Sequence, residues 1–229
     1  MMPGWRWSLP ECAISGIRIK DMKLIGQYDS PFVRRVGVAL QHYGFAYEHL
    51  AWSTFDDGDR FSHHNPLKRV PTLVLDDGEA LIDSGAILDS LDELVGCNRA
   101  LISQSGPDRR HALRRIALVT GAADKAVSYF YAKLFATGLD VTFMERCESQ
   151  IRQTLAVLEQ ECSARTRDWW YGIGPGHDDI AVACVIRFLS EAYPDLYDRT
   201  AHPALAAHCA RAEGLAIFAA VQQTFIPPQ

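Results

Sequence analysis

A serine hydroxyl stands where a helix is expected to begin. Ser30 is followed by Pro31, and apolar residues then recur every three or four positions up to Tyr43. Serine caps helix N-termini and proline suits the first helical position, so the sequence predicts a helix that starts here. Free backbone N–H groups and the positive end of the helix dipole favour a developing anion at such a place. Ser30 could therefore hold a thiolate, or it could serve only as the helix cap.

A thiol bound beside Ser30 would react only if its pKa were lowered. An ordinary Cys thiol titrates near ~8.5, so only a few per cent is thiolate at pH 7. Lowering that pKa by about two units corresponds to about 2.7 kcal/mol, which a hydroxyl hydrogen bond and a helix end can supply together. Tyr28, two residues earlier, is the alternative hydroxyl. The sequence favours Ser30, because a group at the helix end meets the N–H donors directly, whereas a strand-end tyrosine also has an ordinary packing role.

Two further segments could bind a small charged ligand. Val70 precedes Pro71 where an extended segment enters a strand. A cis bond there would turn the peptide of Val70 outward, where it could pair with another peptide like an added strand. Asp83 and Ser84 form another helix start, at which Asp83 could bind an ammonium group and Ser84 a carboxylate. An ordinary trans proline and a plain helix cap are the simpler interpretations.

These segments alternate with short strands in the first half of the chain. The pattern predicts helices at 30–44 and 84–96, strands at 23–28 and 47–52, and a hairpin around Asp-Gly at 70–82. Two strands joined by a helix imply a parallel, right-handed unit, and the hairpin adds an antiparallel pair to the same sheet.

Beyond residue 98 the periodicity is almost entirely helical. A polar linker at 98–107 precedes four predicted helices, at 108–137, 144–162, 180–189 and 204–220. The third is apolar nearly all round and is expected at the centre of its domain. The fold class is therefore an α/β domain at 22–97 followed by an all-helical domain at 108–229, with residues 1–21 as an extension outside the fold.

Composition excludes several classes of protein. The chain has 229 residues, a formal net charge of −5 and no dense basic patch, which argues against nucleic-acid binding. No apolar run approaches the ~20 residues of a membrane span. Six cysteines without a CxxC pair favour reduced thiols in a cytoplasmic protein. His63 and His64 are adjacent and cannot share a helix face as metal ligands, so we predict no metal.

The order of the motifs resembles the glutathione transferase family. The resemblance covers residues 22–96 and rests on a strand that runs into Ser30-Pro31, on Asn65-Pro66-Leu67-Lys68-Arg69-Val70-Pro71-Thr72-Leu73, and on Leu81-Ile82-Asp83-Ser84 before a helix. It implies a thioredoxin-like first domain that binds glutathione as co-substrate, a helical second domain, and a homodimer.

The resemblance assigns roles residue by residue. Ser30 matches the catalytic hydroxyl of the serine-type, bacterial-like classes. Val70 matches the residue before the family's cis-proline, Pro71, and its backbone would pair with the cysteinyl unit of glutathione. Arg69 would lie near the glycyl carboxylate.

Two positions depart from the family pattern. Asp83, which with Ser84 would receive the γ-glutamyl end, replaces the commoner Glu and is one methylene shorter, so reaching an ammonium group would require a water or a shift. Gly176 stands three residues before Asp179, where the family usually has Ser or Thr. The reciprocal capping box is then incomplete, and we expect a somewhat weaker helix start.

The expected activity is that of a glutathione S-transferase, in which the thiolate attacks a small hydrophobic electrophile. The resemblance places the electrophile between the domains, with Tyr129 and Tyr131 as candidate wall residues; neighbouring aromatics considered with them are Phe130, Phe135, Trp169, Trp170 and Tyr171. A glutathione-dependent isomerase or dehalogenase and a non-catalytic glutathione-binding protein are the alternatives. A thiol–disulfide oxidoreductase would need a cysteine near Ser30, and there is none.

Overall fold

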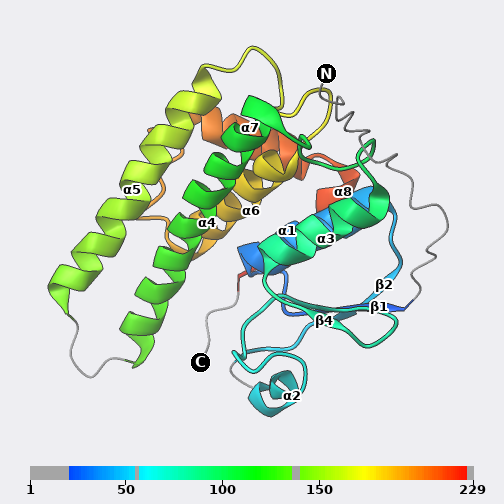
Figure 1. Ribbon diagram of the computed structural model, residues 1–229. Coiled ribbons are helices and arrows are strands. Elements are labelled where there is room, and N and C mark those ends of the chain that lie inside the picture. Colours follow the sequence, from blue (N-terminus) through cyan, green and yellow to red (C-terminus); the bar gives the residue numbers. More distant parts are fainter. Residues whose placement is uncertain (1–20, 55–56, 136–139, 226–229) are drawn as a thin grey trace, which may run out of the picture.

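The computed structural model describes residues 21–54, 57–135 and 140–225 (Figure 1). The first part consists of β1 (Met22–Ile25), α1 (Pro31–Tyr43), β2 (Tyr47–Leu50), α2 (Gly58–Ser62), β3 (Thr72–Val74), β4 (Ala80–Leu81) and α3 (Ser84–Val95). The second part consists of α4 (Gly106–Phe135), α5 (Val141–Ser163), α6 (His177–Ala192), α7 (Pro203–Glu213) and α8 (Ala216–Ala219). The predicted extension at 1–21 lies almost wholly outside the described residues.

The sheet of the first domain has the strand order β2-β1-β3-β4. β1 is parallel to β2 and antiparallel to β3, and β3 is antiparallel to β4. Leu24 and Leu73 face α1 and α3, whereas Ile25 and Val74 face the opposite side, where Phe61 of α2 packs. This alternation with period two gives a sheet covered on both faces, with α1 and α3 on the face toward the helical domain (Figure 1). The predicted thioredoxin-like α/β domain is confirmed.

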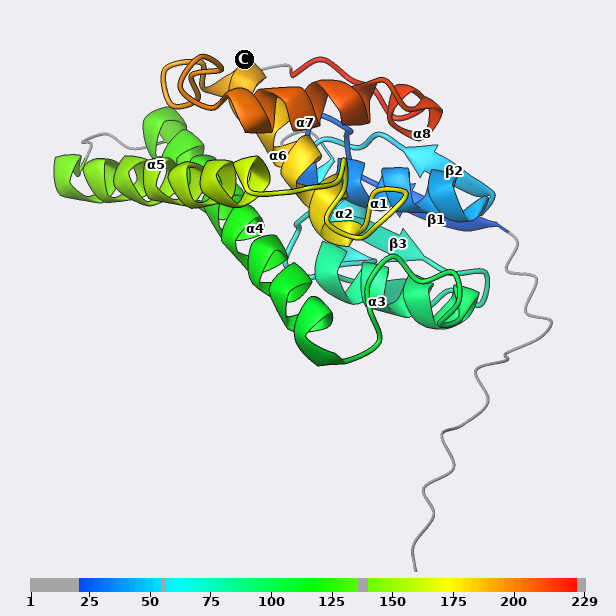
Figure 2. The ribbon, with the colours of Figure 1, turned by 90° about the horizontal axis from the view of Figure 1, so that it is seen from above.

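Helix α6 is the centre of the second domain, as its all-apolar sequence predicts. Its residues from His177 to Ile186 are all buried, and it packs against α1, α4 and α7. Figure 2 shows α4 and α5 extending together beyond one end of the first domain, with α7 alongside α6. Within the described ranges, no helix is both long enough and apolar enough to cross a membrane.

Two predicted elements differ from the structure. The segment after β2 contains the five-residue helix α2, which is too short to show a helical period in the sequence. The predicted helix at 204–220 is wrong as a single helix, because it breaks at Leu215, whose backbone is extended. The break turns the chain so that Phe218 and Val221 pack into the core of the first domain.

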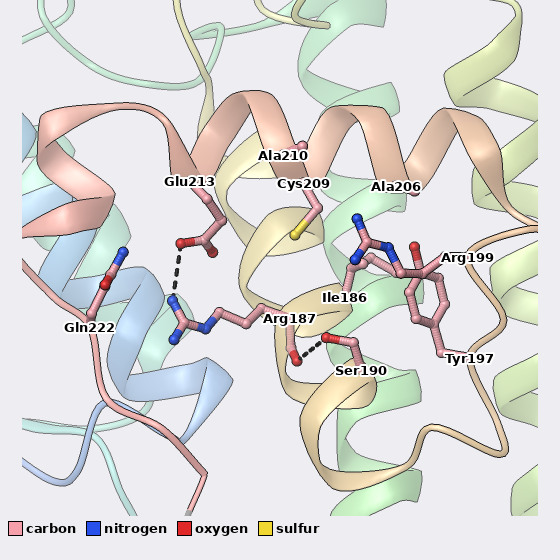
Figure 3. Close-up of a pocket in the computed structure, with 10 residues that line it drawn as sticks. All are labelled: Ile186, Arg187, Ser190, Tyr197, Arg199, Ala206, Cys209, Ala210, Glu213 and Gln222. Atoms are coloured by element: carbon pink, nitrogen blue, oxygen red, sulfur yellow. Dashed lines mark hydrogen bonds and ion pairs between the residues drawn. The ribbon is translucent and has the colours of Figure 1, made fainter.

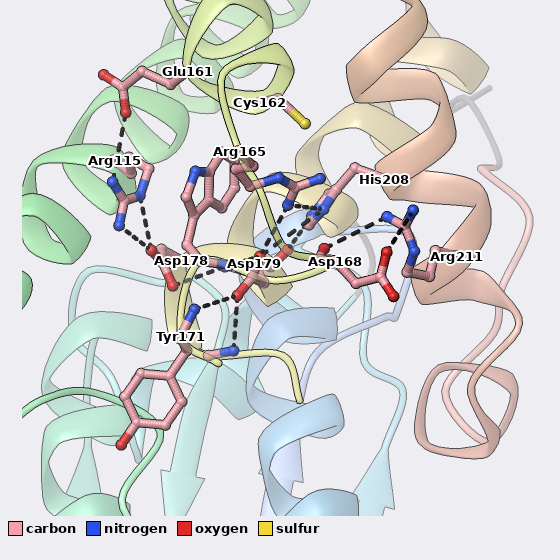
Figure 4. Close-up of polar contacts among 12 residues, drawn as sticks. Arg115, Glu161, Cys162, Arg165, Asp168, Tyr171, Asp178, Asp179, His208 and Arg211 are labelled. Atoms are coloured by element: carbon pink, nitrogen blue, oxygen red, sulfur yellow. Dashed lines mark hydrogen bonds and ion pairs between the residues drawn. The ribbon is translucent and has the colours of Figure 1, made fainter. Parts of the chain in front are cut away.

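The N-terminus of α6 is capped by two aspartate side chains, an arrangement that the sequence did not predict (Figure 4). The Asp179 side chain accepts a hydrogen bond from the Gly176 N–H at 3.0 Å, and the Asp179 N–H donates to Asp178 Oδ1 at 3.1 Å. Asp178 thus takes the part of the missing Ser or Thr hydroxyl, and the capping is more complete than the sequence indicates. A Cβ at position 176 would lie 2.6 Å from the Tyr171 Cβ, so the fold leaves no room for such a side chain.

We therefore predict that Gly176→Ser destabilises the protein, although Ser is usually the better cap. The clash with Tyr171 outweighs the cap gain, and the free energy of unfolding should fall by about 1–2 kcal/mol. Urea unfolding measures this. The control is Gly174→Ser, where a Cβ meets nothing within 4 Å and stability should be unchanged. A Gly176→Ser protein as stable as the parent would contradict the packing argument.

His208 lies beneath the same cluster and is fully buried. Arg165 donates to its Nδ1 at 2.9 Å, so the ring is neutral and its Nε2–H donates to the Asp179 carbonyl at 3.0 Å. Burial, helped by the charges of Arg165 and Arg211, lowers the pKa of His208 from 6.5 to about 4. The folded state therefore holds this histidine without a proton at pH values where the unfolded chain protonates it.

The lowered pKa predicts acid sensitivity with a defined sign. Below about pH 6.5 the unfolded chain binds a proton at His208, whereas the folded protein does not. The free energy of unfolding therefore falls as the pH is lowered to about pH 4, and His208 contributes up to about 3 kcal/mol of this loss. Unfolding curves across that range should show a shallower slope for His208→Gln. The exposed His63→Gln variant is the matched control and should keep the parental slope. Equal slopes for parent and His208→Gln would refute the assignment.

Candidate functional site

A cleft of about 1090 Å³ lies between the two domains. One wall comes from the first domain: the turn between β1 and α1, the segment after β2 and the segment before β3, which contribute residues 27, 29–32, 52–54 and 67–70. The other wall comes from α4, with one residue of α6 and one near the C-terminus: Asp124, Val127, Ser128, Phe130, Tyr131, Leu134, Phe135, Phe188 and Phe225.

Ser30 lines this cleft at the N-terminus of α1. It is the N-cap, with an extended backbone, and its Oγ accepts from the Val33 N–H at 3.5 Å, the outer limit of a hydrogen bond. Pro31 has no N–H, so the donors of the first turn begin at Phe32. Among the described residues the Ser30 hydroxyl has no hydrogen-bond acceptor, so it can donate to a ligand in the cleft.

Tyr28 lies elsewhere. Its side chain is buried, its hydroxyl shares a 2.8 Å hydrogen bond with the Tyr47 hydroxyl, and its ring stacks on His49 at 3.8 Å between centroids. Burial raises the pKa of Tyr28 well above its usual range. Tyr28 is not among the residues that line the cleft, so of the two candidate hydroxyls the structure brings Ser30 to it.

Val70 and Arg69 join Ser30 in the cleft, and the Val70–Pro71 bond is cis. Pro71 itself is buried behind them. Gly26 allows the end of β1 to lie close to Val70. It has φ +126°, and a Cβ at this position would lie 2.8 Å from the Val70 Cβ. Within the described part of the chain, the Val70 backbone makes no hydrogen bond. Its peptide is therefore available to another peptide, as the sequence predicts for a cis turn.

Arg69 forms an ion pair across the cleft. Its Nη2 lies 3.2 Å from Oδ1 of Asp124 on α4, and both side chains are exposed. Asp124 could not be predicted from the sequence, because contacts between a loop of one domain and a helix of the other leave no local pattern. An exposed pair of this kind contributes little to stability, so Arg69 can exchange Asp124 for another carboxylate.

Asp83 and Ser84 start α3 but do not line the cleft. Asp83 is the N-cap, and its Oδ1 accepts from the N–H groups of Gly85 and Ala86 at 2.7 and 3.3 Å. Arg35 is buried beside this helix start, where a Cβ at Gly85 would lie 3.8 Å from its Nη2. Burial lowers the pKa of Arg35 to about 10, while the carboxylates of Asp83 and Asp124 raise it.

The aromatic wall differs in part from the prediction. Tyr131 lines the cleft and stacks on Phe135 with 5.8 Å between ring centroids. Tyr129 was wrongly placed: it is buried in the helical core, where its hydroxyl donates to Glu148 at 2.8 Å. Trp170 is also remote, since it packs between the guanidinium groups of Arg115 and Arg165. Sequence reasoning missed four lining aromatics from separate elements: Phe32, Trp52, Phe188 and Phe225.

Metal ligands are not gathered in the described part of the chain. No group of three or more His, Cys, Asp or Glu side chains there has an arrangement that could hold a metal ion. The cleft instead offers the Ser30 hydroxyl, the free Val70 peptide, the basic side chains of Lys68 and Arg69, and an apolar wall. That set suits a peptide-like ligand with charged ends beside an apolar molecule.

The fold and the cleft define a two-domain protein with a thioredoxin-like first domain and a ligand site at the interdomain boundary. The chain matches the family described as "Glutathione S-transferase, N-terminal domain" over residues 24–99 and "Glutathione S-transferase, C-terminal domain" over residues 142–211. The chain belongs to the glutathione transferase family. A solved glutathione S-transferase from Methylobacterium radiotolerans, in complex with glutathione sulfonate, is similar with a TM-score of 0.82 and 28% identity, covering 92% of this chain and all of that one.

Curated relatives match over different lengths. Glutathione S-transferase U6 of Arabidopsis thaliana is 29% identical over 75% of this chain and 73% of its own length. The GST-like protein YibF of Escherichia coli is 31% identical over 45% of this chain, and maleylacetoacetate isomerase of Pseudomonas aeruginosa is 38% identical over 44% of it. These two matches span only about half of each relative, 50% and 49%.

Proposed function

We propose that the chain is a serine-type glutathione transferase that holds the glutathione thiolate at the N-terminus of α1. One observation carries the proposal: a single cleft joins the Ser30 hydroxyl and the unpaired Val70 peptide to an aromatic wall on α4. The solved relative from M. radiotolerans is in complex with glutathione sulfonate, a derivative of the ligand proposed for this cleft. The half of the cleft beside Tyr131 and Phe135 would take a small hydrophobic electrophile.

Glutathione would bind along the first-domain wall. The Val70 backbone would pair with the cysteinyl unit beside Pro71, which fixes the sulfur relative to Ser30. Arg69 would exchange Asp124 for the glycyl carboxylate. The γ-glutamyl end would extend toward Asp83 and Ser84 at the start of α3. Arg35, buried beside that helix start, favours the carboxylate of this end electrostatically.

The chemical step follows from this placement. The Ser30 hydroxyl donates to the thiolate sulfur, and the first-turn N–H groups and helix dipole stabilise its charge further. The thiol proton passes to solvent. The sulfur then forms a bond to the electrophilic carbon, and the bond from that carbon to its leaving group breaks with both electrons. The aromatic wall keeps the electrophile beside the sulfur and away from water.

Substitution of the two hydroxyls tests the assignment. Ser30→Ala removes the donor to the thiolate, so kcat/KM with glutathione and an aryl halide should fall by about 100-fold, and the pH midpoint of activity should move upward by about one unit or more. Tyr28→Phe should retain activity within about threefold, because its hydroxyl bonds Tyr47 outside the cleft. Loss of turnover in Tyr28→Phe with retention in Ser30→Ala would reverse the assignment. Glutathione binding with no turnover on any electrophile would favour a binding protein.

A glutathione-dependent isomerase is the second candidate, because the maleylacetoacetate isomerase relative has 38% identity over its matched part. The two reactions differ in stoichiometry. A transferase consumes one glutathione for each electrophile, whereas an isomerase returns it after each turnover. We expect free thiol to fall in step with product when the protein is given glutathione and an aryl halide. Rapid isomerisation of maleylacetoacetate with constant free thiol, and no conjugation, would favour the isomerase.

A homodimer remains a prediction from the family resemblance, and a cytoplasmic location remains a prediction from the cysteine pattern. Sedimentation of the purified chain would test the first.

A further inference from the structure

A second pocket, of about 300 Å³, opens between α6 and α7 (Figure 3). It shares no lining residue with the interdomain cleft. Its size lies at the lower end of the range for small-ligand sites. The lining residues come from α6, α7, the loop between them and the C-terminal segment: Ile186, Arg187, Ser190, Tyr197, Arg199, Ala206, Cys209, Ala210, Glu213 and Gln222.

The Tyr197 hydroxyl in this pocket has no partner. The side chain is only 4% exposed, and its hydroxyl is buried without a hydrogen bond to any described residue. Burial raises the pKa of Tyr197 to about 12, so the group keeps its proton and remains a donor. A buried hydroxyl without an acceptor is unusual in a folded protein and indicates that an acceptor enters from outside.

Arg199 provides a positive charge beside Tyr197. It lines the same pocket as Tyr197 and Cys209, its side chain is exposed, and its charge lowers the pKa of both groups. Arg199 forms no ion pair with any residue in the described ranges. The neighbouring Asp198 carboxylate accepts instead from the N–H and hydroxyl of Thr200, at 2.8 and 2.7 Å. Arg199 is therefore the cation of this pocket that is left to pair with a ligand.

The other charges of the pocket are already paired. Arg187 contacts Glu213 at 3.1 Å and Glu191 at 2.8 Å, and Glu213 also binds both terminal nitrogens of buried Arg34. Figure 3 shows the Arg187–Glu213 pair at one end of the pocket and Tyr197 with Arg199 at the other. A ligand anion would therefore meet its donors at the second end, away from the Glu213 carboxylate.

The space between the two ends is mostly apolar, and the Ser190 hydroxyl there donates to the Arg187 carbonyl at 2.7 Å. Ile186, Ala206 and Ala210 present only aliphatic groups, and burial raises the pKa of Cys209 to about 11, which keeps its thiol neutral. One donor and one free cation at an end of an apolar chamber match a single carboxylate on an apolar body. A dianion such as phosphate fits less well, because Glu213 and Asp198 lie close and only one guanidinium is free.

We propose that this pocket binds a small apolar monocarboxylate. The ligand carboxylate accepts from the Tyr197 hydroxyl and pairs with Arg199, and the apolar body packs against Ile186, Ala206 and Ala210. The site is independent of the transferase reaction and takes a different class of ligand from glutathione.

Phenylacetate and its neutral analogue phenylacetamide test the proposal by isothermal titration of the full chain. Phenylacetate should bind at one site, and phenylacetamide should bind about tenfold more weakly or not at all. Tyr197→Phe keeps the ring and Arg199→Gln keeps most of the side-chain length, and each should weaken phenylacetate binding about tenfold. Arg110→Gln, on the exposed surface of α4, is the matched control and should leave binding unchanged. Thermal melting confirms that each variant is folded.

Four outcomes would overturn the proposal: equal binding of the acid and the amide, unchanged affinity in Tyr197→Phe, displacement by S-methylglutathione, or no heat up to about 10 mM phenylacetate. Displacement would mean that the probe enters the interdomain cleft. Because S-methylglutathione reports on that cleft alone, failure of this pocket and failure of the proposed transferase function are separate results.

Discussion

The anchoring of helix α1 is the constraint on which both the fold and the cleft depend. Its N-terminus carries Ser30, and one turn later Arg34 is buried and bound to Glu213 through both terminal nitrogens, at 2.6 and 2.7 Å, while its Nε donates to the Val221 carbonyl at 3.0 Å. Hydrogen bonds of this kind offset the cost of burying a guanidinium group. The pair therefore fixes α1 against α7 and the C-terminal segment, and with it the position of the serine relative to the α4 wall.

The same helix decides which hydroxyl faces the cleft. A Cβ at Gly37 would lie 2.7 Å from Cε1 of Tyr28, so the tyrosine ring packs directly onto the α1 backbone. That contact and the stack on His49 hold the ring against the first-domain core. Ser30 lies just beyond, at the N-terminus of α1, where it lines the cleft. The two hydroxyls, only two residues apart in sequence, thus lie in different surroundings. Tyr28 packs against the side of α1, and Ser30 lies at its N-terminus.

Local patterns predicted most of the fold, whereas contacts between distant segments escaped them. Helix starts and ends could be predicted because each depends on one residue: Ser30 caps α1 with its own hydroxyl, and Gly44 and Gly96 end their helices with φ of +75° and +78°. The sequence predicted the first-domain wall of the cleft best, because Arg69 and Val70 belong to a continuous motif. The α4 wall depends on helical phase over a long helix: Tyr131 lines the cleft while Tyr129, two residues earlier, points into the core. Residue type alone does not separate these two tyrosines.

Helix α6 explains how one small fold can present two unrelated cavities. It is buried over most of its length, so every face of it requires a covering element, and α1, α4 and α7 supply them. Residues 187 and 188 are about 100° apart around a helix, so consecutive side chains reach different surroundings. Phe188 contributes its ring to the interdomain cleft, and Arg187 contributes its charge to the pocket beside α7. Arg187 keeps its charge satisfied at this pocket by pairing with Glu213 and Glu191.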